Sequence, residues 1–528
     1  MSRSIMPRRR KKCTITPIMN RLFAGRAPLI AARVPLMWSV VMLAGAALAA
    51  AASVLLTYWI PPATVAVVGL PALAAGFWMI RRYRVGALVL LLLVLPLGRL
   101  TVPALDPVVS PVTVLAVVAV AAWLWRLLFN SERIEFSYMQ VPLAIFLLCG
   151  VISIYGAPDI VQATKILVIF LMAASVYLVA SQTIRSPEEV RKLMWAAATA
   201  TGIIGSYTAV TWMLQSGGVE QGDYSRAVGI FGSPNALGGF LALAMPPILA
   251  LAGSESLWWK RLLGYLLLTA AMVGLALTYS RGAWIATAVG LLVLLPLVRR
   301  GWLAVGLALL AAMVAAGGDV LVRATSVAAP GSDTAYTSRV EIWQTSLRLL
   351  AEHPLRGVGL GNFELAYGDS MQPNLALLAD TLLIPEEAHN LFLNLAVEVG
   401  LVGAGAFAWL LVVGFLRAWQ VRRSADRRVK IWSAGLAAGL VALLIHTTID
   451  VVVYQGFVTI LLFTYLGVMD ALVRLDGGQG GGEPTSSRAN PAWIPDSAPR
   501  NIPSAAHAHR AQYPVVPVRR PNHRRPGN

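Results

Sequence analysis

Long runs of apolar residues are the feature that most constrains the fold of this chain. A helix needs about 20 apolar residues to cross the ~30 Å hydrocarbon core of a bilayer. Fourteen runs approach this length, although the third is short and only a two-proline step separates the first two. They predict an all-α, polytopic integral membrane protein with about 12–14 transmembrane helices. The runs are 35–59, 62–80, 85–98, 108–125, 141–156, 161–181, 194–214, 237–253, 262–279, 283–298, 301–317, 394–416, 431–453 and 456–473.

The composition supports this class and argues against a nucleic-acid partner. Hydrophobic residues make up 57% of the 528 residues and charged residues only 13%, whereas about 25% of an average soluble domain is charged. The formal net charge of +18 does not by itself indicate DNA or RNA binding, because such proteins are rich in charges of both signs. We therefore expect the lipid bilayer, and no nucleic acid, as a partner.

The positions of the basic residues predict the orientation. If fourteen spans alternate from a cytoplasmic N-terminus, the inner segments carry 35 of the 43 lysines and arginines. An excess of positive charge is typical of cytoplasmic loops. The expected organisation is a basic cytoplasmic leader that continues into a signal anchor (1–34), a multi-pass domain (35–473), and a disordered basic cytoplasmic tail (474–528). Both termini are thus predicted to be cytoplasmic.

Two predicted outer segments are too long to be simple turns. The first covers 215–236. The second, at 318–393, is rich in acidic residues and has enough internal pattern to predict a large, partly helical outer loop.

A short amphipathic helix is predicted inside the second outer segment. Ser338 and Glu341 have the spacing of a capping box at its start, and His353-Pro354 should end it. Its first turn carries Arg339. Apolar residues then recur at helical spacing, which predicts a helix lying on the outer membrane surface. These residues are Val340, Trp343, Leu347 and Leu350.

Two arginines at the outer ends of spans are candidates for binding an anion. Arg281 lies between two spans that have almost no loop between them. An arginine at membrane level is costly unless it snorkels or has an anionic partner, so it is either an interfacial anchor or a cation aimed at a phosphate or carboxylate. Arg226 precedes the Gly- and Pro-containing segment 229–235. That segment either forms an ordinary turn or offers an anion the free N–H groups of a helix N-terminus.

One histidine is a candidate for proton transfer. His389 follows Glu386 and Glu387, precedes Asn390, and lies at the outer start of a predicted span. Histidine is the side chain best suited to exchange a proton near neutral pH. A structural role is the alternative.

Further polar residues interrupt the predicted spans. Asn390, Asn394 and Glu398 recur every four residues, so one face of that helix should be polar at its start. His446 and Asp450 are also four apart, near the outer end of the penultimate span. They either orient a catalytic group or hold helices together through polar contacts.

The sequence predicts neither a metal nor a cofactor. No cysteine–histidine cluster has zinc-ligand spacing, and the outer segments contain no Asp-x-Asp pair. The glycines of 357–361 lack the strand–helix context and downstream acid of a dinucleotide site.

Four segments together form a recognisable pattern. They are RAVGIFGSPNALGGFLAL at 226–243, LTYSRGAWIA at 277–286, SRVEIWQTSLRLLAEHPLRGVGLGNF at 338–363 and AHNLFLNLAVEVGLVGAGAF at 388–407. In this order, they resemble the bacterial O-antigen ligase and O-antigen polymerase family of polytopic membrane glycosyltransferases. The resemblance covers a core at residues 220–450 and places the large outer loop where that family has it.

The resemblance implies transfer of a glycan from an undecaprenyl-diphosphate donor to an acceptor hydroxyl. The reaction would take place on the outer face of the bacterial cytoplasmic (inner) membrane, in the biosynthesis of cell-surface polysaccharide. The acceptor would be the lipid A core of lipopolysaccharide for a ligase, the growing lipid-linked glycan for a polymerase, or a protein for some relatives.

The resemblance also implies roles for individual residues. Three arginines match the family's outer arginines and would bind the donor diphosphate: Arg226, Arg281 and Arg339. His389 matches the histidine of the family's His-Asn element and, with Arg281, would be catalytic without a metal. A single displacement would invert the anomeric carbon. Supporting roles would fall to Glu386, Glu387, Asn390 and Asp450.

A transporter or flippase of lipid-linked saccharides is the alternative function. Transporters carry their ionisable residues near the midplane of the bilayer and show inverted repeats. In this sequence the distinctive charges instead gather at the predicted outer face. That placement favours a transferase.

Overall fold

The computed structural model describes residues 84–97, 110–129, 134–215, 218–221, 224–298, 301–316, 334–370 and 385–480. They lie within one compact unit that ends at Gly480. The predicted leader, the first two apolar runs and the part of the predicted tail beyond 480 lie outside the described residues.

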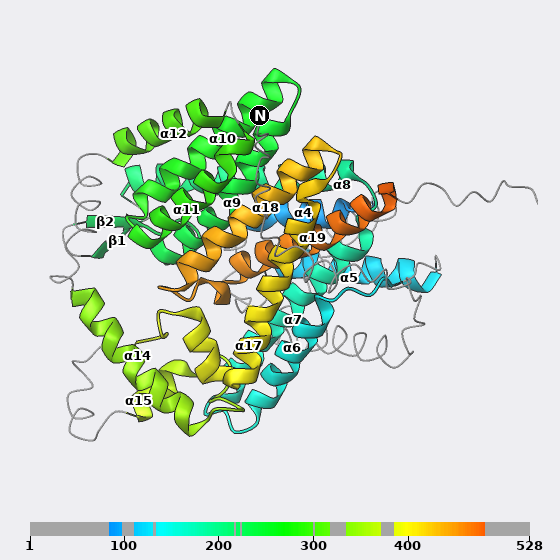
Figure 1. Ribbon diagram of the computed structural model, residues 1–528. Helices are drawn as coiled ribbons and strands as arrows, with labels where there is room; N and C mark the ends of the chain where they lie inside the picture. The colour runs from blue at the N-terminus through cyan, green and yellow to red at the C-terminus, as the bar shows by residue number, and fades with distance from the viewer. Residues whose placement is uncertain are drawn as a thin grey trace, which may run out of the picture. The chain divides into compact units, whose positions relative to one another are not determined.

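Each apolar run that falls in the described residues forms a helix (Figure 1). Among those residues, eight helices are long and apolar enough to cross a membrane, and four shorter helices are also apolar. These helices confirm the prediction of an all-α polytopic membrane protein. The eight are α5 (Pro111–Phe129), α7 (Ile160–Thr183), α8 (Pro187–Met213), α9 (Pro234–Ser254), α10 (Trp258–Leu277), α17 (Leu391–Gln420), α18 (Arg427–Thr447) and α19 (Gly456–Gly480). The four are α4 (Gly86–Val94), α6 (Gln140–Ile154), α11 (Arg281–Leu294) and α12 (Gly301–Ala316).

Helix α9 is the most completely buried of the long helices and packs against α8, α10, α11 and α18 (Figure 1). Small residues allow these close approaches. A Cβ atom added at Gly239 would lie 2.9 Å from the His446 ring, and one at Gly435 would lie 2.4 Å from the Cβ of Ala250. Helices in a bilayer commonly associate through small residues in this way. The close packing fixes the relative positions of the helix ends that carry the candidate site.

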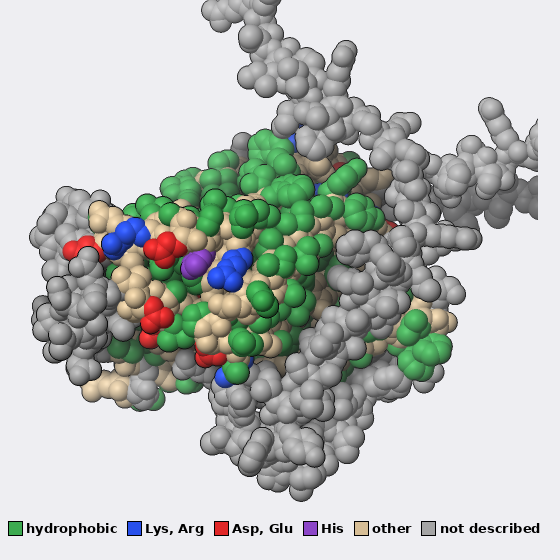
Figure 2. Space-filling model, turned by 90° about the horizontal axis from the view of Figure 1, so that it is seen from below, with side chains coloured by type: hydrophobic (Ala, Val, Ile, Leu, Met, Phe, Trp, Pro, Cys, Tyr) green, Lys and Arg blue, Asp and Glu red, His purple; other side chains and the backbone are tan. Residues whose placement is uncertain are grey.

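Large apolar side chains cover the outside of the helices. Leu128, Phe129 and Leu303 are 63%, 65% and 73% exposed. Figure 2 shows a broad hydrophobic surface on which the few charged side chains gather mainly toward one side. A water-soluble monomer rarely exposes so large an apolar surface. The surface is therefore suited to contact with lipid.

The two long segments that were predicted to lie outside the membrane contain secondary structure of their own. The first holds an antiparallel hairpin of β1 (Gly218–Gln221) and β2 (Tyr224–Ala227), which pairs Arg226 with Val219. The second holds α14 (Thr334–Glu352) and the short α15 (Phe363–Asp369).

Helix α14 corrects one sequence prediction and confirms another. It begins at Thr334, so Ser338 lies inside the helix and the predicted capping-box start is wrong. The residues just before Ser338 also adopt helical conformation, which places the start one turn earlier. The helix ends at Glu352, immediately before His353-Pro354, as predicted.

The buried side of α14 also differs from the predicted stripe. Ile342, Ser346 and Leu349 are buried, whereas Leu347 is 57% exposed. The buried residues contact a small hydrophobic cluster that includes Phe363 of α15 and residues of α17. The apolar side of α14 therefore packs against other parts of the protein. It is centred on Ile342 and Leu349 and not on the predicted stripe that includes Leu347.

The segment after α14 crosses α17 at a break in that helix. Gly400 has φ of 76°, a left-handed conformation that interrupts the helix. A Cβ atom there would lie 2.1 Å from the carbonyl oxygen of Leu355. Three backbone hydrogen bonds of 2.9 Å join the two segments: Leu401 N–H to Pro354 O, Val358 N–H to Val397 O, and Gly359 N–H to Glu398 O.

We expect Gly400→Ala to destabilise this crossing. The added methyl group meets backbone atoms that cannot move independently, and the left-handed conformation is unfavourable for alanine. The expected loss is about 2–3 kcal/mol of unfolding free energy, seen as a lower melting temperature of the purified protein. Gly405→Ala, on the same helix with no neighbouring atom within 4 Å of the new Cβ, is the matched control. Equal melting temperatures for the two variants would contradict the prediction.

Candidate functional site

Two turns with unusual backbone conformations carry the two candidate catalytic residues. Tyr279, two residues before Arg281, and His389 itself both have φ of 50°. Residues other than glycine seldom adopt this left-handed region. Such a conformation costs about 1–3 kcal/mol and persists only where the surrounding structure holds it. The folded protein thus fixes both turns at an energetic cost.

The Arg281 turn is held by its own neighbours. Tyr279 is buried, with its ring 6.4 Å from that of Trp284. The backbone N–H of Ser280 donates to Oγ1 of Thr278 at 3.2 Å. Arg281 is the half-buried first residue of α11. Because the free N–H groups of a helix N-terminus favour negative charge, its guanidinium lies where an anion is already stabilised.

The His389 turn is fixed by two asparagines. Asn390 caps α17 and donates from Nδ2 to the carbonyl oxygen of Thr448 at 3.1 Å. Asn394 accepts the backbone N–H of Ala388 at 2.9 Å. The predicted polar face of this helix therefore orients the backbone on both sides of His389.

His389 belongs to a cluster with two carboxylates. Its Nδ1 lies 3.5 Å from Oε1 of Glu387. The backbone N–H of Val451 donates to Oδ1 of Asp450 at 2.9 Å and contacts Oε1 of Glu387 at 3.4 Å. One ligand atom from each of the three side chains lies within 4.8 Å of the others. The structure thus brings Asp450, which the sequence spacing had paired only with His446, to Glu387 and His389.

Burial raises the pKa of the Glu387 carboxyl to about 7, and the Asp450 carboxylate acts in the same direction while His389 opposes it. Glu387 therefore changes protonation near neutral pH. Its side chain is 29% exposed and that of His389 33% exposed, so a substrate can reach both.

A second set of contacts surrounds His446, which lies four residues before Asp450, and reaches the Arg281 turn and Arg226. The Nε2 of His446 lies 3.1 Å from the carbonyl oxygen of Asn235, whose side chain accepts from Arg226 at 3.0 Å. Arg226 also donates from Nε to the carbonyl oxygen of Thr278 at 2.9 Å. A Cβ atom at Gly282 would lie 3.4 Å from Nδ1 of His446. Arg226 is thus engaged with the ends of α9 and α10.

Helix α14 brings Arg339 to the same end of the bundle. Trp343, one turn after it, donates from Nε1 to the carbonyl oxygen of Ala388 at 2.9 Å. The charge of Arg339 also acts on His446. Arg339 is therefore carried to the end of the bundle at which the candidate site lies.

Two other predicted polar residues are not members of this cluster. Glu386 is exposed beside it. Glu398 is buried and accepts a hydrogen bond from the hydroxyl of Tyr454, so its contacts join α17 to the turn before α19. Spacing in the sequence gave no sign of this Tyr454 contact.

The cluster has the donor set of a metal site. One imidazole and two carboxylates are ligands that divalent cations accept, and Glu387, His389 and Asp450 are close enough to share one. The same three groups are equally suited to passing a proton. A metal site and a proton-transfer site respond differently to removal of metal ions.

Fold and site together define a multi-pass membrane protein with arginines and a histidine–carboxylate cluster gathered at one end of its helices. Residues 264–408 match the domain family described as O-antigen ligase, which confirms the resemblance for that part of the chain. Arg281, Arg339 and His389 lie within the matched residues, whereas Arg226 and Asp450 lie outside them. No curated protein matches the chain. The domain indicates a glycosyltransferase-like enzyme of polysaccharide biosynthesis.

Proposed function

We propose that this protein transfers a glycan from an undecaprenyl-diphosphate donor to an acceptor hydroxyl on the outer face of the bacterial cytoplasmic membrane. The observation that carries the proposal is the junction, at one end of the bundle, of the Arg281 turn and the Glu387–His389–Asp450 cluster. The Arg281 turn supplies a positive charge for the leaving group, and the cluster supplies a group that accepts a proton.

In this proposal the arginines bind the donor diphosphate. Guanidinium groups form charge-assisted, often bidentate hydrogen bonds to phosphate oxygens. Arg281 and Arg339 are half-buried at the site and are assigned direct contact. Arg226 is nine-tenths buried and donates to Thr278 and Asn235, so its contribution includes holding the Arg281 turn in place.

The reaction follows from these positions. The acceptor oxygen forms a bond to the anomeric carbon of the donor while the bond from that carbon to the phosphate oxygen breaks. The hydroxyl proton passes to His389, which Glu387 and Asp450 orient and stabilise in its charged form. The lipid diphosphate leaves with the electron pair, and Arg281 and Arg339 stabilise its negative charge. This single displacement inverts the anomeric configuration.

Metal chelation separates proton transfer from metal catalysis. Because arginines provide the positive charge in the proposed reaction, the purified enzyme should keep its full transfer rate after dialysis against EDTA. Activity that falls on chelation and returns with added Mn²⁺ or Zn²⁺ would instead assign the cluster as a metal centre.

The pH dependence of transfer should report the ionisation of Glu387. With a pKa of about 7, the carboxylate that assists His389 is lost as the pH falls, so the rate should drop about tenfold from pH 8 to pH 6. Glu387→Gln should lower the rate and flatten this dependence. Glu386→Gln, a change to the exposed neighbouring acid, should leave both unchanged. A wild-type slope retained by Glu387→Gln would exclude Glu387 as the titrating group.

The function itself is tested by product size. Purified protein is given an undecaprenyl-diphosphate-linked oligosaccharide together with lipid A core, a second copy of the donor, or a peptide acceptor. A ladder of repeats identifies a polymerase, whereas one addition to lipid A core or peptide identifies a ligase. If no product forms but liposome-bound donor moves between leaflets, the protein is the alternative transporter or flippase.

A further inference from the structure

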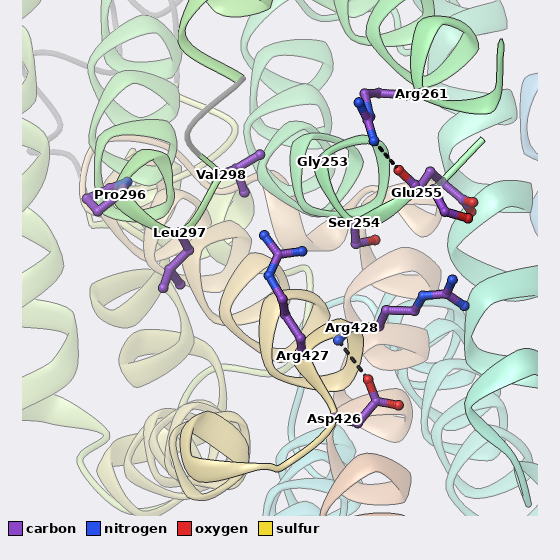
Figure 3. Close-up of a pocket in the computed structure, with 11 residues that line it drawn as sticks. Gly253, Ser254, Glu255, Arg261, Pro296, Leu297, Val298, Asp426, Arg427 and Arg428 are labelled. Atoms are coloured by element: carbon purple, nitrogen blue, oxygen red, sulfur yellow. Dashed lines mark hydrogen bonds between the residues drawn. The ribbon is translucent and has the colours of Figure 1, made fainter. Parts of the chain in front are cut away.

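Four helices have one end at the candidate site and the other end around a separate cavity. Helices α9 and α11 begin beside the site, at Pro234 and Arg281, while α10 and α18 end there, at Leu277 and Thr447. Their opposite ends surround a cavity of about 790 Å³ (Figure 3). Because a helix of 20 residues is about 30 Å long, the cavity lies one bilayer thickness from the site.

Basic groups dominate the lining of this cavity. Three arginines line it (Arg261, Arg427 and Arg428), together with two acids. Both acids already have partners. Glu255 is buried, 3.3 Å from Arg191 and 2.9 Å from the indole N–H of Trp195, and Asp426 caps α18 by accepting the N–H of Arg428 at 2.8 Å.

Arg427 is available to a ligand. It is exposed, and it has no hydrogen bond or ion pair to any residue that the structure describes. Figure 3 shows its side chain extending from the start of α18 toward Leu297 and Ser254. Across the cavity, Arg261 donates from Nη2 to the carbonyl oxygen of Glu255 at 2.7 Å, and its buried Nε–H has no partner within the described residues.

Exposed tryptophans place this end of the bundle at a membrane surface. Trp258 and Trp302 are 73% and 55% exposed and lie at the first turns of α10 and α12. Trp419 is 47% exposed near the end of α17, and the guanidinium of Arg422 lies 4.4 Å from its ring centre. Tryptophan is enriched where lipid headgroups meet the hydrocarbon. A ligand in the cavity is therefore at headgroup depth.

We propose that the cavity binds the phosphate group of an anionic phospholipid from the surrounding bilayer. The guanidinium groups of Arg427 and Arg261 would donate to its oxygens, and the N-terminus of the 21-residue helix α18 would add partial positive charge. Basic pockets between helices at the cytoplasmic side of membrane proteins suit such headgroups. A soluble phosphate compound offers the same chemistry, but the tryptophans favour the lipid.

The test measures lipid binding to the purified full-length protein in an uncharged detergent. Native mass spectrometry would compare phosphatidylglycerol, phosphatidylcholine with the same acyl chains, and glycerol 3-phosphate. We expect phosphatidylglycerol to bind selectively, and Arg427→Gln to weaken it about five- to tenfold. Arg261→Gln should have a similar effect. Arg423→Gln, which replaces an exposed arginine at the same end but outside the cavity lining, is the matched control and should bind normally.

Each other outcome would overturn the proposal. Wild-type affinity in both Arg427→Gln and Arg261→Gln would show that the cavity does not bind the headgroup. Equal binding of phosphatidylcholine would remove the role of negative charge. Glycerol 3-phosphate binding as tightly as phosphatidylglycerol would assign the cavity to a soluble phosphate compound. Because the Arg427 side chain has no partner among the described residues, its replacement should leave the fold intact, and an unchanged size-exclusion profile would check this.

Discussion

Arg281→Ala should reduce glycan transfer by about 10²–10³-fold, the usual cost of removing one preorganised donor from a developing negative charge. The guanidinium lies at the start of α11, beside a turn that the left-handed Tyr279 and buried packing hold in place. Its charge is therefore positioned before substrate binds. The loss should appear mainly in kcat, because the negative charge on the diphosphate grows as the glycosidic bond breaks.

Two variants control this result. Arg281→Lys keeps the charge but loses the planar pair of donors, so it should recover only part of the activity. Arg356→Ala removes an exposed arginine that contacts the carbonyl oxygen of Tyr155, away from the site, and should be nearly silent. Transfer at the wild-type rate by folded, membrane-inserted Arg281→Ala would remove this residue from the mechanism.

His389→Ala should lower the transfer rate by about 10²–10⁴-fold, the range typical of a lost general acid–base group. The imidazole is partly exposed and lies 3.5 Å from Glu387, so it reaches a substrate on one side and a carboxylate on the other. Rates should be measured with saturating donor and acceptor, because the loss is expected in the chemical step.

The surrounding chain offers a matched histidine. His353 follows α14 on the same outer segment, and His353→Ala should leave the rate close to wild type. A pH profile adds an independent readout: any residual activity of His389→Ala should lose most of the pH dependence seen in the wild type. If His389→Ala and His353→Ala were equally active, His389 would be structural.

The sequence predicted the features that depend on neighbouring residues, namely apolar runs and short motifs. Apolar runs of spanning length predicted each of the apolar helices in the described residues. Short motifs identified Arg281 and His389, because each lies at the junction between a turn and a helix. Local patterning failed for α14, where packing against α15 and α17 selects a different buried face.

The sequence did not predict which distant residues meet. Val451, which holds Asp450 and Glu387 together, is 64 positions from Glu387. His446 and Asn235 are 211 positions apart. Nothing in the local periodicity encodes such contacts, since they depend on how the helices pack through glycines such as Gly239 and Gly282. The candidate residues could therefore be named from the sequence, but how they come together required the fold.

The crossing of the segment after α14 over α17 makes that segment rigid close to the candidate site. Backbone hydrogen bonds attach residues 354–359 to α17 on both sides of Gly400, so this stretch is a fixed wall and does not act as a lid. In the proposed reaction, any movement that admits a glycan to the site would therefore have to come from another part of the chain.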